Sequence, residues 1–264
     1  MLQDGDTAVS DGTARSRTPG TPRGATRLSW RLPGGREGAT SVGPRMSRDE
    51  IARVETVVTG LFPHLDAAGE RIARTLYQLL ARGQPVAPQA LADAAGADPE
   101  TIAATLGGWH GIHRDASGAV TGFWGLTLDA TPHRLEVAGR TLHAWCAWDT
   151  LFLPSLLETT AEVASLCPAT GTEVRLVVTP SGMRAASPET VMSFVTPERA
   201  RIQEDVVRHF CRFVRFFASA HDAGGWLERH PGTFVVSLPE AWQLARVKLA
   251  AQYPSFGAAA HTAA

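Results

Sequence analysis

Residues 133–157 read HRLEVAGRTLHAWCAWDTLFLPSLL, and this stretch decides the fold that we expect. In HRLEV and RTLHA, apolar and polar residues alternate, which is typical of half-buried β-strands. Ala138-Gly139 between the two runs predicts a turn. Residues 149–157 then predict a short helix with Pro154 inside it or at its end. A strand pair followed at once by an apolar helix indicates an α+β fold with a mostly antiparallel sheet and surrounding helices.

The rest of the C-terminal half continues this alternation of strands and helices. Three further strands are predicted in AEVASLC (161–167), EVRLVVTP (173–180) and TVMSFVT (190–196). The polar residues 197–205 predict the start of a helix. The aromatic run VVRHFCRFVRFFAS (206–219) predicts a strand. A short helix is expected in GGWLERHP (224–231), and residues 232–253 predict a strand followed by a terminal helix.

The N-terminal half predicts a helical module. Ser47 to Glu50 form a capping-box pattern before a helix that ends near Gly60, and a second helix covers residues 66–82. A short helix, a turn at Gly96 and a helix from Pro99 follow, and a hairpin closes the module with its turn at residues 115–118. We therefore expect a disordered extension (1–45), a winged-helix-like helical module (46–128) and an α+β catalytic domain bearing the cysteines (129–258).

A winged helix raises DNA binding as a rival function. The helix that would enter the DNA groove reads DPETIAATL (98–106), which contains acidic residues and neither arginine nor lysine. Binding to duplex DNA draws much of its affinity from neutralising phosphates. We therefore predict that the module is structural and that nucleic acid is not a partner.

The composition is that of a globular bacterial protein. The chain has 264 residues and a net charge of −1, and Lys248 is its only lysine, which fits the codon bias of a GC-rich genome. No apolar run reaches the roughly 18–20 residues that span a bilayer, and no secretory signal begins the chain. Three cysteines cannot all pair within one chain, so we expect a cytoplasmic protein with reduced thiols and no membrane partner.

Familiar catalytic motifs are missing from the sequence. It contains no CxxC pair, no H-E-x-x-H, no P-loop, no Rossmann glycine pattern and no G-x-S-x-G elbow. What remains is Cys146, Cys167 and Cys211, together with Asp149 three residues after the first cysteine. Taken singly, each cysteine reads as a small buried hydrophobe, and Asp149 reads as a helix cap.

Three cysteine-bearing segments together are far more specific than any single cysteine. They are LHAWCAWDTLFLPSLL (142–157), ASLCPATGTEVRLVVTP (164–180) and FCRFVRFFAS (210–219). In order and separation they resemble the cysteine segments of the bacterial organomercurial (alkylmercury) lyases. GFWGLTL (122–128) and GTFVVSLPEAWQLA (232–245) fit the pattern of this family too, and the resemblance covers roughly residues 48–253.

The resemblance implies roles by position. Cys146 and Cys211 would be the two mercury-binding thiols, and Asp149 their acid partner, which also helps to hold Hg(II) after cleavage. Cys167 falls on a cysteine that the family uses structurally, so we expect it to be packed and unreactive. The family's winged-helix-like N-terminal part and antiparallel sheets agree with the periodicity. Residues 1–45 have no counterpart in typical members, and Arg212 stands where some members carry a further cysteine.

The implied reaction is protonolytic cleavage of a carbon–mercury bond, giving a hydrocarbon and Hg(II) in bacterial mercury detoxification. Mercury is soft and prefers thiolates. A second thiolate on the same mercury pushes electron density onto the carbon, which then accepts a proton. A carboxyl whose pKa is raised by burial could take that proton from a thiol and deliver it. We expect Trp145, Trp148, Phe210 and Phe213 to shape an apolar cleft around these groups: this expectation rests on their position beside the cysteines.

This reading implies an organomercurial substrate, no organic cofactor, external cytosolic thiols that remove Hg(II), and hand-off to mercuric reductase where the full resistance system is present. Two alternatives stay open on the sequence alone. A non-catalytic soft-metal binding protein would use the same thiols without needing Asp149. A thiol-sensing winged-helix regulator is disfavoured by the lack of basic residues in the helix at 99–106.

Overall fold

The strand pair expected in residues 133–144 lies in the middle of the main sheet. In the computed structural model, which describes residues 48–256, β4 (His133–Val137) and β5 (Arg140–Ala144) pair antiparallel with Leu135 opposite Leu142. Alternate residues of β4 are buried, as a strand with one covered face requires. Ala138 and Gly139 make the turn with φ values of 49° and 78°, and positive φ at both positions is the mark of a type I′ hairpin.

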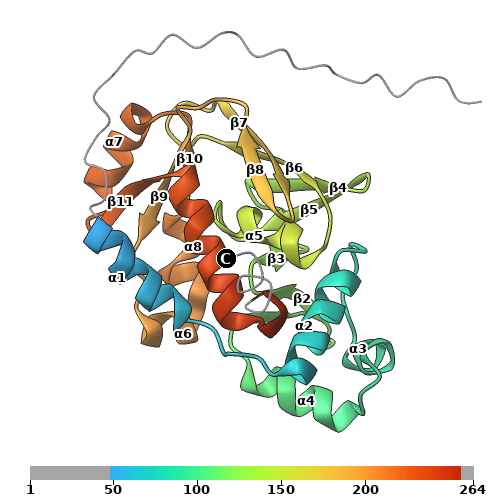
Figure 1. Cartoon of the computed structure of the whole chain (residues 1–264). Helices are drawn as coiled ribbons and strands as arrows, with labels where there is room; N and C mark the ends of the chain where they lie inside the picture. Colours follow the sequence, from blue (N-terminus) through green and yellow to red (C-terminus); the bar gives the residue numbers. More distant parts are fainter. Residues whose placement is uncertain (1–47, 257–264) are drawn as a thin grey trace, which may run out of the picture. The chain divides into compact units, whose positions relative to one another are not determined.

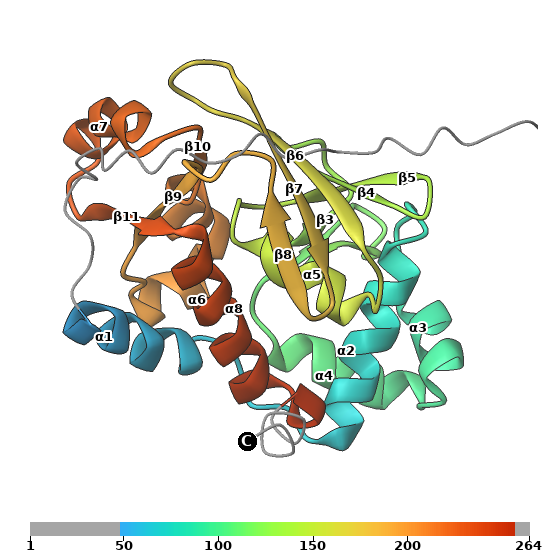
Figure 2. The same ribbon diagram turned by 45° about the horizontal axis from the view of Figure 1, so that its top comes forward.

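Eight strands form the main sheet in the order β1-β2-β3-β5-β4-β6-β7-β8, and all of their pairings are antiparallel (Figures 1 and 2). The other six strands are β1 (Ile112–Arg114), β2 (Val120–Phe123), β3 (Leu126–Thr127), β6 (Ala161–Leu166), β7 (Glu173–Thr179) and β8 (Gly182–Ala185). A second sheet has the order β10 (Phe216–Phe217), β9 (Val191–Val195) and β11 (Thr233–Ser237). The prediction of an α+β fold with a large antiparallel sheet is therefore confirmed.

Helix α5 (Asp149–Leu156) lies between the main sheet and the C-terminal helix α8 (Leu238–Gln252). It contacts β4 and β7 on one side and α8 on another, and all eight of its residues are buried. Figure 1 shows α8, in red, running beside it. At the start of α5, the Trp148 indole N–H donates a hydrogen bond of 3.0 Å to the Ala241 carbonyl of α8. The apolar run that the sequence shows here is thus a helix enclosed by protein on all sides.

Four helices and a hairpin precede the central strands, in the predicted order. They are α1 (Arg48–Thr59), α2 (Ala67–Leu80), α3 (Pro88–Ala95), α4 (Pro99–Gly108) and the β1–β2 hairpin. Asp66 and Asp98 cap α2 and α4 through their carboxylates, and Gly96 ends α3 with φ 63°. Whether this module is a winged helix, and whether it is separate from residues 129–258, stay predictions. Residues 1–45, Ser47, and residues 257–258 lie outside the described residues.

The strand predicted over residues 206–219 is wrong. Helix α6 (Arg199–His209) runs through the first part, a 3₁₀ turn η1 (Cys211–Phe213) follows, and only β10 at the end is extended. Within α6 the buried residues are Ile202 and Val206, and a break at Asp205 separates them. The aromatic and β-branched composition suggested a strand, but Cys211 begins a turn and does not lie in a strand.

The start of α7 and the presence of β8 also differ from the prediction. Helix α7 (Ala220–Arg229) starts before the expected Gly224-Gly225, because the Ser219 side chain accepts a hydrogen bond from the Asp222 N–H and caps it. Strand β8 was not predicted, since its four residues are too few to show a periodicity.

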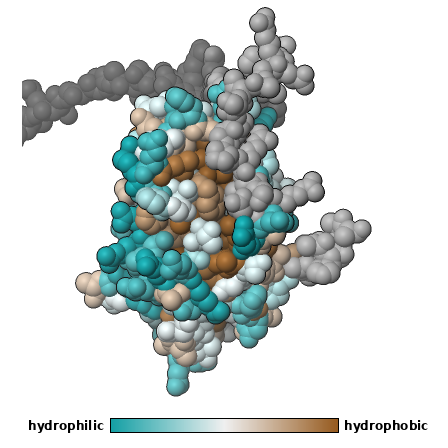
Figure 3. Space-filling model, turned by 90° about the vertical axis from the view of Figure 1, so that its left-hand side faces the viewer, coloured by the Kyte–Doolittle hydropathy of each residue, from teal (hydrophilic) through white to brown (hydrophobic). Residues whose placement is uncertain are grey.

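None of the helices described in residues 48–256 is long and apolar enough to cross a membrane. On the face drawn in Figure 3, hydrophobic residues show as brown patches among hydrophilic ones. In the described part of the chain, Leu166 is the one large hydrophobic residue that is exposed, at 54%.

Candidate active site

The structure brings Cys146, Asp149 and Cys211 into one buried group. Their sulfur and carboxylate oxygen atoms lie within 4.8 Å of one another, and the three residues are 0%, 6% and 2% exposed. Cys146 lies in the loop between β5 and α5, Asp149 is the first residue of α5, and Cys211 begins η1. The Ala147 N–H donates a hydrogen bond of 3.2 Å to the Val214 carbonyl, which joins the two cysteine segments directly.

Asp149 points back toward the Cys146 loop. Its carboxylate accepts a hydrogen bond of 2.9 Å from the Cys146 backbone N–H. The alternative in which Asp149 caps α5 does not describe this geometry, because the N-cap residue is Trp148 and no side chain caps the helix. The carboxylate is therefore held beside the two sulfur atoms by a backbone contact, as a proton carrier between them would need.

Burial raises the pKa of all three groups. It raises the pKa of Asp149 to about 6, opposed by the hydrogen bonds from Cys146 and by the charge of Lys248. It also raises the pKa of the Cys146 thiol well above its ordinary value and raises that of Cys211. Near neutral pH the resting site thus combines two protonated thiols with a carboxylate that can accept a proton from either.

Gly125 makes room for this carboxylate. It has φ 104°, and a β-carbon added there would lie 2.7 Å from the Asp149 carboxyl, closer than such atoms can approach. The Gly125 carbonyl accepts a hydrogen bond of 2.8 Å from the Trp145 N–H, and the Tyr77 hydroxyl donates one of 3.0 Å to the Trp124 carbonyl. The turn before β3 is therefore fixed on both sides of the glycine, and Asp149 packs directly against it.

We expect Gly125→Ala to displace Asp149 and to lower the free energy of unfolding by more than about 1 kcal/mol, the cost of an unfavourable φ alone. Urea unfolding measures the loss, and the carboxyl ¹³C titration of Asp149 reports its displacement. Gly139→Ala is the matched control, since Gly139 also has a positive φ of 78° but an added β-carbon meets nothing within 4 Å. Equal losses and an unmoved Asp149 titration in both variants would contradict the close contact.

Lys248 is a functional candidate that the sequence reasoning missed. It is 1% exposed, and its Nζ lies 3.9 Å from the ring centroid of Phe152 and 4.8 Å from that of Phe62. Its ammonium has no hydrogen-bond partner among the described residues. Phe152 follows Asp149 by three positions on α5, so the two share a helix face. Burial lowers the pKa of Lys248 to about 7, and the Asp149 charge acts against this shift.

A second basic side chain near the thiols is that of the partly buried Arg215. An Arg215 Nη1 donates to His133 Nε2 at 3.3 Å, so the proton of the neutral ring is on Nδ1, which faces the Ser165 Oγ at 2.9 Å. Burial and the Arg215 charge lower the pKa of His133 to about 3, which keeps the ring neutral. The Arg215 guanidinium lowers the pKa of Cys211, against the larger effect of burial. Arg215 therefore favours thiolate formation in this site.

Cys167 lies outside the buried group. It is 1% exposed, at the end of β6, so the expectation that it is packed is confirmed, while its lack of reactivity stays a prediction. None of the three cysteines, all of which the structure describes, forms a disulfide.

The four aromatic residues expected around the site do not form one cluster. Trp148 and Phe210 pack edge to face with ring centroids 5.9 Å apart, and both are buried. Trp145 instead lies tilted against His113 with ring centroids 4.6 Å apart, and Phe213 lies against His230 at 5.9 Å. Their role in shaping a cleft for an organic group stays a prediction.

Comparisons with known proteins show which family this chain resembles. The alkylmercury lyase (MerB) family model matches residues 126–249. An alkylmercury lyase of Streptomyces lividans is 40% identical over 200 residues, 75% of this chain and 91% of that protein. One of Staphylococcus epidermidis is 40% identical over 189 residues, 71% of this chain and 85% of that protein.

A solved structure shares the fold. It is described as the mercury-bound form of MerB2 and superposes with a TM-score of 0.61 at 23% identity, covering 76% of this chain and 97% of that one. At this identity the likeness shows the fold alone, whereas the curated relatives match at higher identity over most of their own length. The chain belongs to the alkylmercury lyase family.

Proposed function

We propose that this protein is an organomercurial lyase that cleaves carbon–mercury bonds by protonolysis, releasing a hydrocarbon and Hg(II). The observation that carries the proposal is the buried group of two thiols and one carboxyl within 4.8 Å. Soft thiolates bind mercury, and a buried carboxyl with a pKa of about 6 moves a proton near neutral pH. These are the parts that the reaction needs, and they lie together.

The reaction begins when one cysteine replaces the thiol that carries the organomercurial. The proton of the cysteine leaves on the departing thiol, and the product is R–Hg–S–Cys. This linear complex is stable because mercury already has two soft partners. Either Cys146 or Cys211 can replace the carrier thiol on mercury, since both sulfurs lie in the same buried group with Asp149.

Cleavage follows when the second thiol joins the same mercury. Asp149 accepts the proton of that thiol, the new thiolate binds mercury, and electron density moves onto the carbon. Asp149 then delivers the proton to the carbon as the carbon–mercury bond breaks, so R–H leaves and Hg(II) stays between two sulfurs. The proton in the hydrocarbon comes from the second thiol, and Asp149 returns to its carboxylate form, in which it can help to hold Hg(II).

The proposal includes no organic cofactor, because the thiols and the carboxyl supply every bond change. External thiols such as those of the cytoplasm would remove Hg(II) by exchange, and mercuric reductase would receive it where the organism has one. We place the protein in the cytoplasm, where thiols stay reduced. We assign the helical module a structural role, since α4 has no arginine or lysine to meet a phosphate backbone.

The proposal is tested by incubating purified protein with phenylmercury and excess 2-mercaptoethanol and measuring benzene. Many equivalents of benzene per chain are the expected result. Stoichiometric mercury binding without benzene would instead indicate a soft-metal binding protein. Shifted mobility of a DNA fragment, with no benzene, would indicate a regulator.

Removing the charge of Lys248 should move the acid limb of the pH–rate profile. Asp149 must be ionised to accept a thiol proton, so the rate falls as pH drops through its pKa of about 6. The Lys248 charge stabilises the carboxylate, so Lys248→Met should raise that apparent pKa by about one unit or more. At low pH the variant then loses rate that the parent protein keeps.

Arg246→Met is the matched control. It also removes a positive charge from α8, but the Arg246 charge does not contribute to the pKa shift of Asp149. Lys248→Arg, which keeps the charge, should leave the acid limb close to that of the parent. An acid limb that stays in place in Lys248→Met would show that this ammonium does not influence Asp149.

A further inference from the structure

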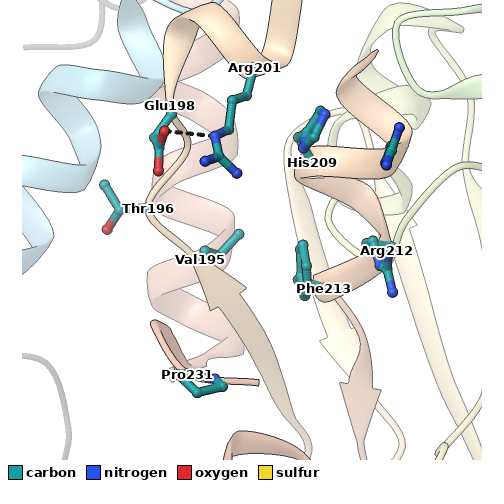
Figure 4. Close-up of a pocket in the computed structure, with 9 residues that line it drawn as sticks. Val195, Thr196, Glu198, Arg201, His209, Arg212, Phe213 and Pro231 are labelled. Carbon is teal, nitrogen blue, oxygen red and sulfur yellow. Dashed lines mark ion pairs between the residues drawn. The ribbon is translucent and has the colours of Figure 1, made fainter. Parts of the chain in front are cut away.

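A polar cleft of about 270 Å³ lies beside the segment that carries Cys211. Figure 4 shows Val195, Glu198 and Arg201 on one side of it and His209 and Phe213 on the other. Its charged lining consists of three arginines and one glutamate, namely Arg201, Arg208, Arg212 and Glu198. The cleft therefore carries a net positive charge, and it is lined partly by residues that flank Cys211 in the chain.

Two of the arginines keep their charge available. Glu198 pairs with Arg201 at 3.0 Å. Within residues 48–256, neither Arg208 nor Arg212 forms an ion pair, and both are exposed. The cleft can thus offer two guanidinium groups to an anion without first breaking a salt bridge.

Helix α6 is broken at Asp205, just before the residues that line the cleft. Asp205 has φ −158° and ψ 97°, which no helix allows, and its carboxylate accepts a hydrogen bond of 2.9 Å from the Arg208 N–H. After this break Arg208 and His209 line the cleft, while Cys211 is buried and does not line it. The residues that precede and follow the Cys211 thiol in the chain thus form the cleft wall.

His209 adds a polar atom that lacks a partner. Its Nε2 is buried and has no hydrogen-bond partner among the described residues, since Glu204 stands 3.8 Å away. A buried polar atom without a partner is uncommon in folded proteins, and a bound ligand can satisfy it. His209 lines the cleft together with Arg208 and Arg212.

We propose that this cleft binds the carboxylate groups of the thiol that brings the organomercurial and removes Hg(II). The inference rests on the proposed function. Guanidinium groups pair with carboxylates in a planar, bidentate geometry. A thiol held there is concentrated beside the Cys211 segment. The cleft would serve the exchange step that removes Hg(II) from the protein. In this step two carrier thiols replace the two protein sulfurs on mercury, so the products are a mercury atom bound to two carrier sulfurs and two free cysteine thiols. No oxidation state changes.

The test uses three small thiols that differ mainly in charge: 3-mercaptopropionate, 2-mercaptoethanol and cysteamine. For each, the thiol concentration that gives half-maximal benzene release from phenylmercury is measured in the parent protein and in the double variant Arg208→Gln/Arg212→Gln. Comparing the variant with its parent for the same thiol cancels the differences in thiol pKa. Arg82→Gln is the control, because it removes one exposed charge far along the chain from the cleft residues.

We expect the double variant to need about fivefold more 3-mercaptopropionate for half-maximal benzene release, which is the effect of losing two partly exposed charge pairs. The concentration of 2-mercaptoethanol should rise less. The concentration of cysteamine should stay the same or fall. The preference should weaken as salt is added. Equal changes for all three thiols, or none, would overturn the inference.

A binding experiment separates this inference from the proposed function. S-methylglutathione carries carboxylates but no reactive sulfur, and calorimetry with it needs no mercury. Weaker binding in Arg208→Gln/Arg212→Gln than in Arg82→Gln supports the cleft even if no benzene forms. Benzene release with 2-mercaptoethanol but equal binding of S-methylglutathione in both variants would reject the cleft and leave the lyase proposal intact.

Discussion

Replacing Asp149 with asparagine is expected to lower the rate of benzene release from phenylmercury by about 10²- to 10⁴-fold, the range of a general acid–base group. Asparagine has nearly the same shape and can still accept the hydrogen bond that the Cys146 N–H donates to Asp149. It cannot take a proton from a thiol near neutral pH. The variant should therefore fold, bind mercury and accumulate R–Hg–S–Cys without releasing the hydrocarbon.

Intact-protein mass spectrometry distinguishes this outcome from loss of binding, because a retained phenyl group adds its mass to the mercury adduct. A variant that still releases benzene at the parent rate would show that the proton reaches the carbon by another route. A variant that no longer binds phenylmercury would assign Asp149 to the binding of mercury and not to proton transfer.

Replacing Cys211 with serine is expected to reduce benzene release by on the order of 10³-fold or more, as the loss of one member of a catalytic unit does. Serine fills nearly the same buried volume, but its oxygen is a hard ligand that mercury avoids. Cys146 would still take phenylmercury from a carrier thiol, and the reaction would stop at this complex.

Cys167→Ser is the matched control, since Cys167 is also buried but lies outside the group of ligand atoms. It should release benzene at nearly the parent rate. A loss of turnover in Cys167→Ser equal to that in Cys211→Ser would contradict the assignment of the two reactive thiols.

Local periodicity explains which parts of the fold could be predicted. β4, β5 and α5 were predicted because their alternation, turn and apolar run lie within one short stretch. The segment around Cys211 was predicted wrongly, because its aromatic residues resemble a strand, whereas the chain there forms a broken helix, a 3₁₀ turn and the short strand β10.

The candidate site could not be derived from spacing. Cys146 and Cys211 meet because the Ala147 N–H reaches the Val214 carbonyl, a contact between distant segments that leaves no local pattern. Only the resemblance to a family predicted their pairing. Lys248 was visible as the single lysine, but the rings of Phe62 and Phe152 that enclose it come from far along the chain. Its burial therefore became apparent only in three dimensions.

The central claim is that Cys146 and Cys211 bind the same mercury atom, and X-ray absorption at the mercury L₃ edge tests it most directly. Reduced protein loaded with one equivalent of Hg(II), with free thiol removed, should show two sulfur neighbours. One of them should be lost in Cys211→Ser and neither in Cys167→Ser. A mercury atom with one sulfur neighbour in the parent protein, or a sulfur count that Cys211→Ser leaves unchanged, would contradict the account.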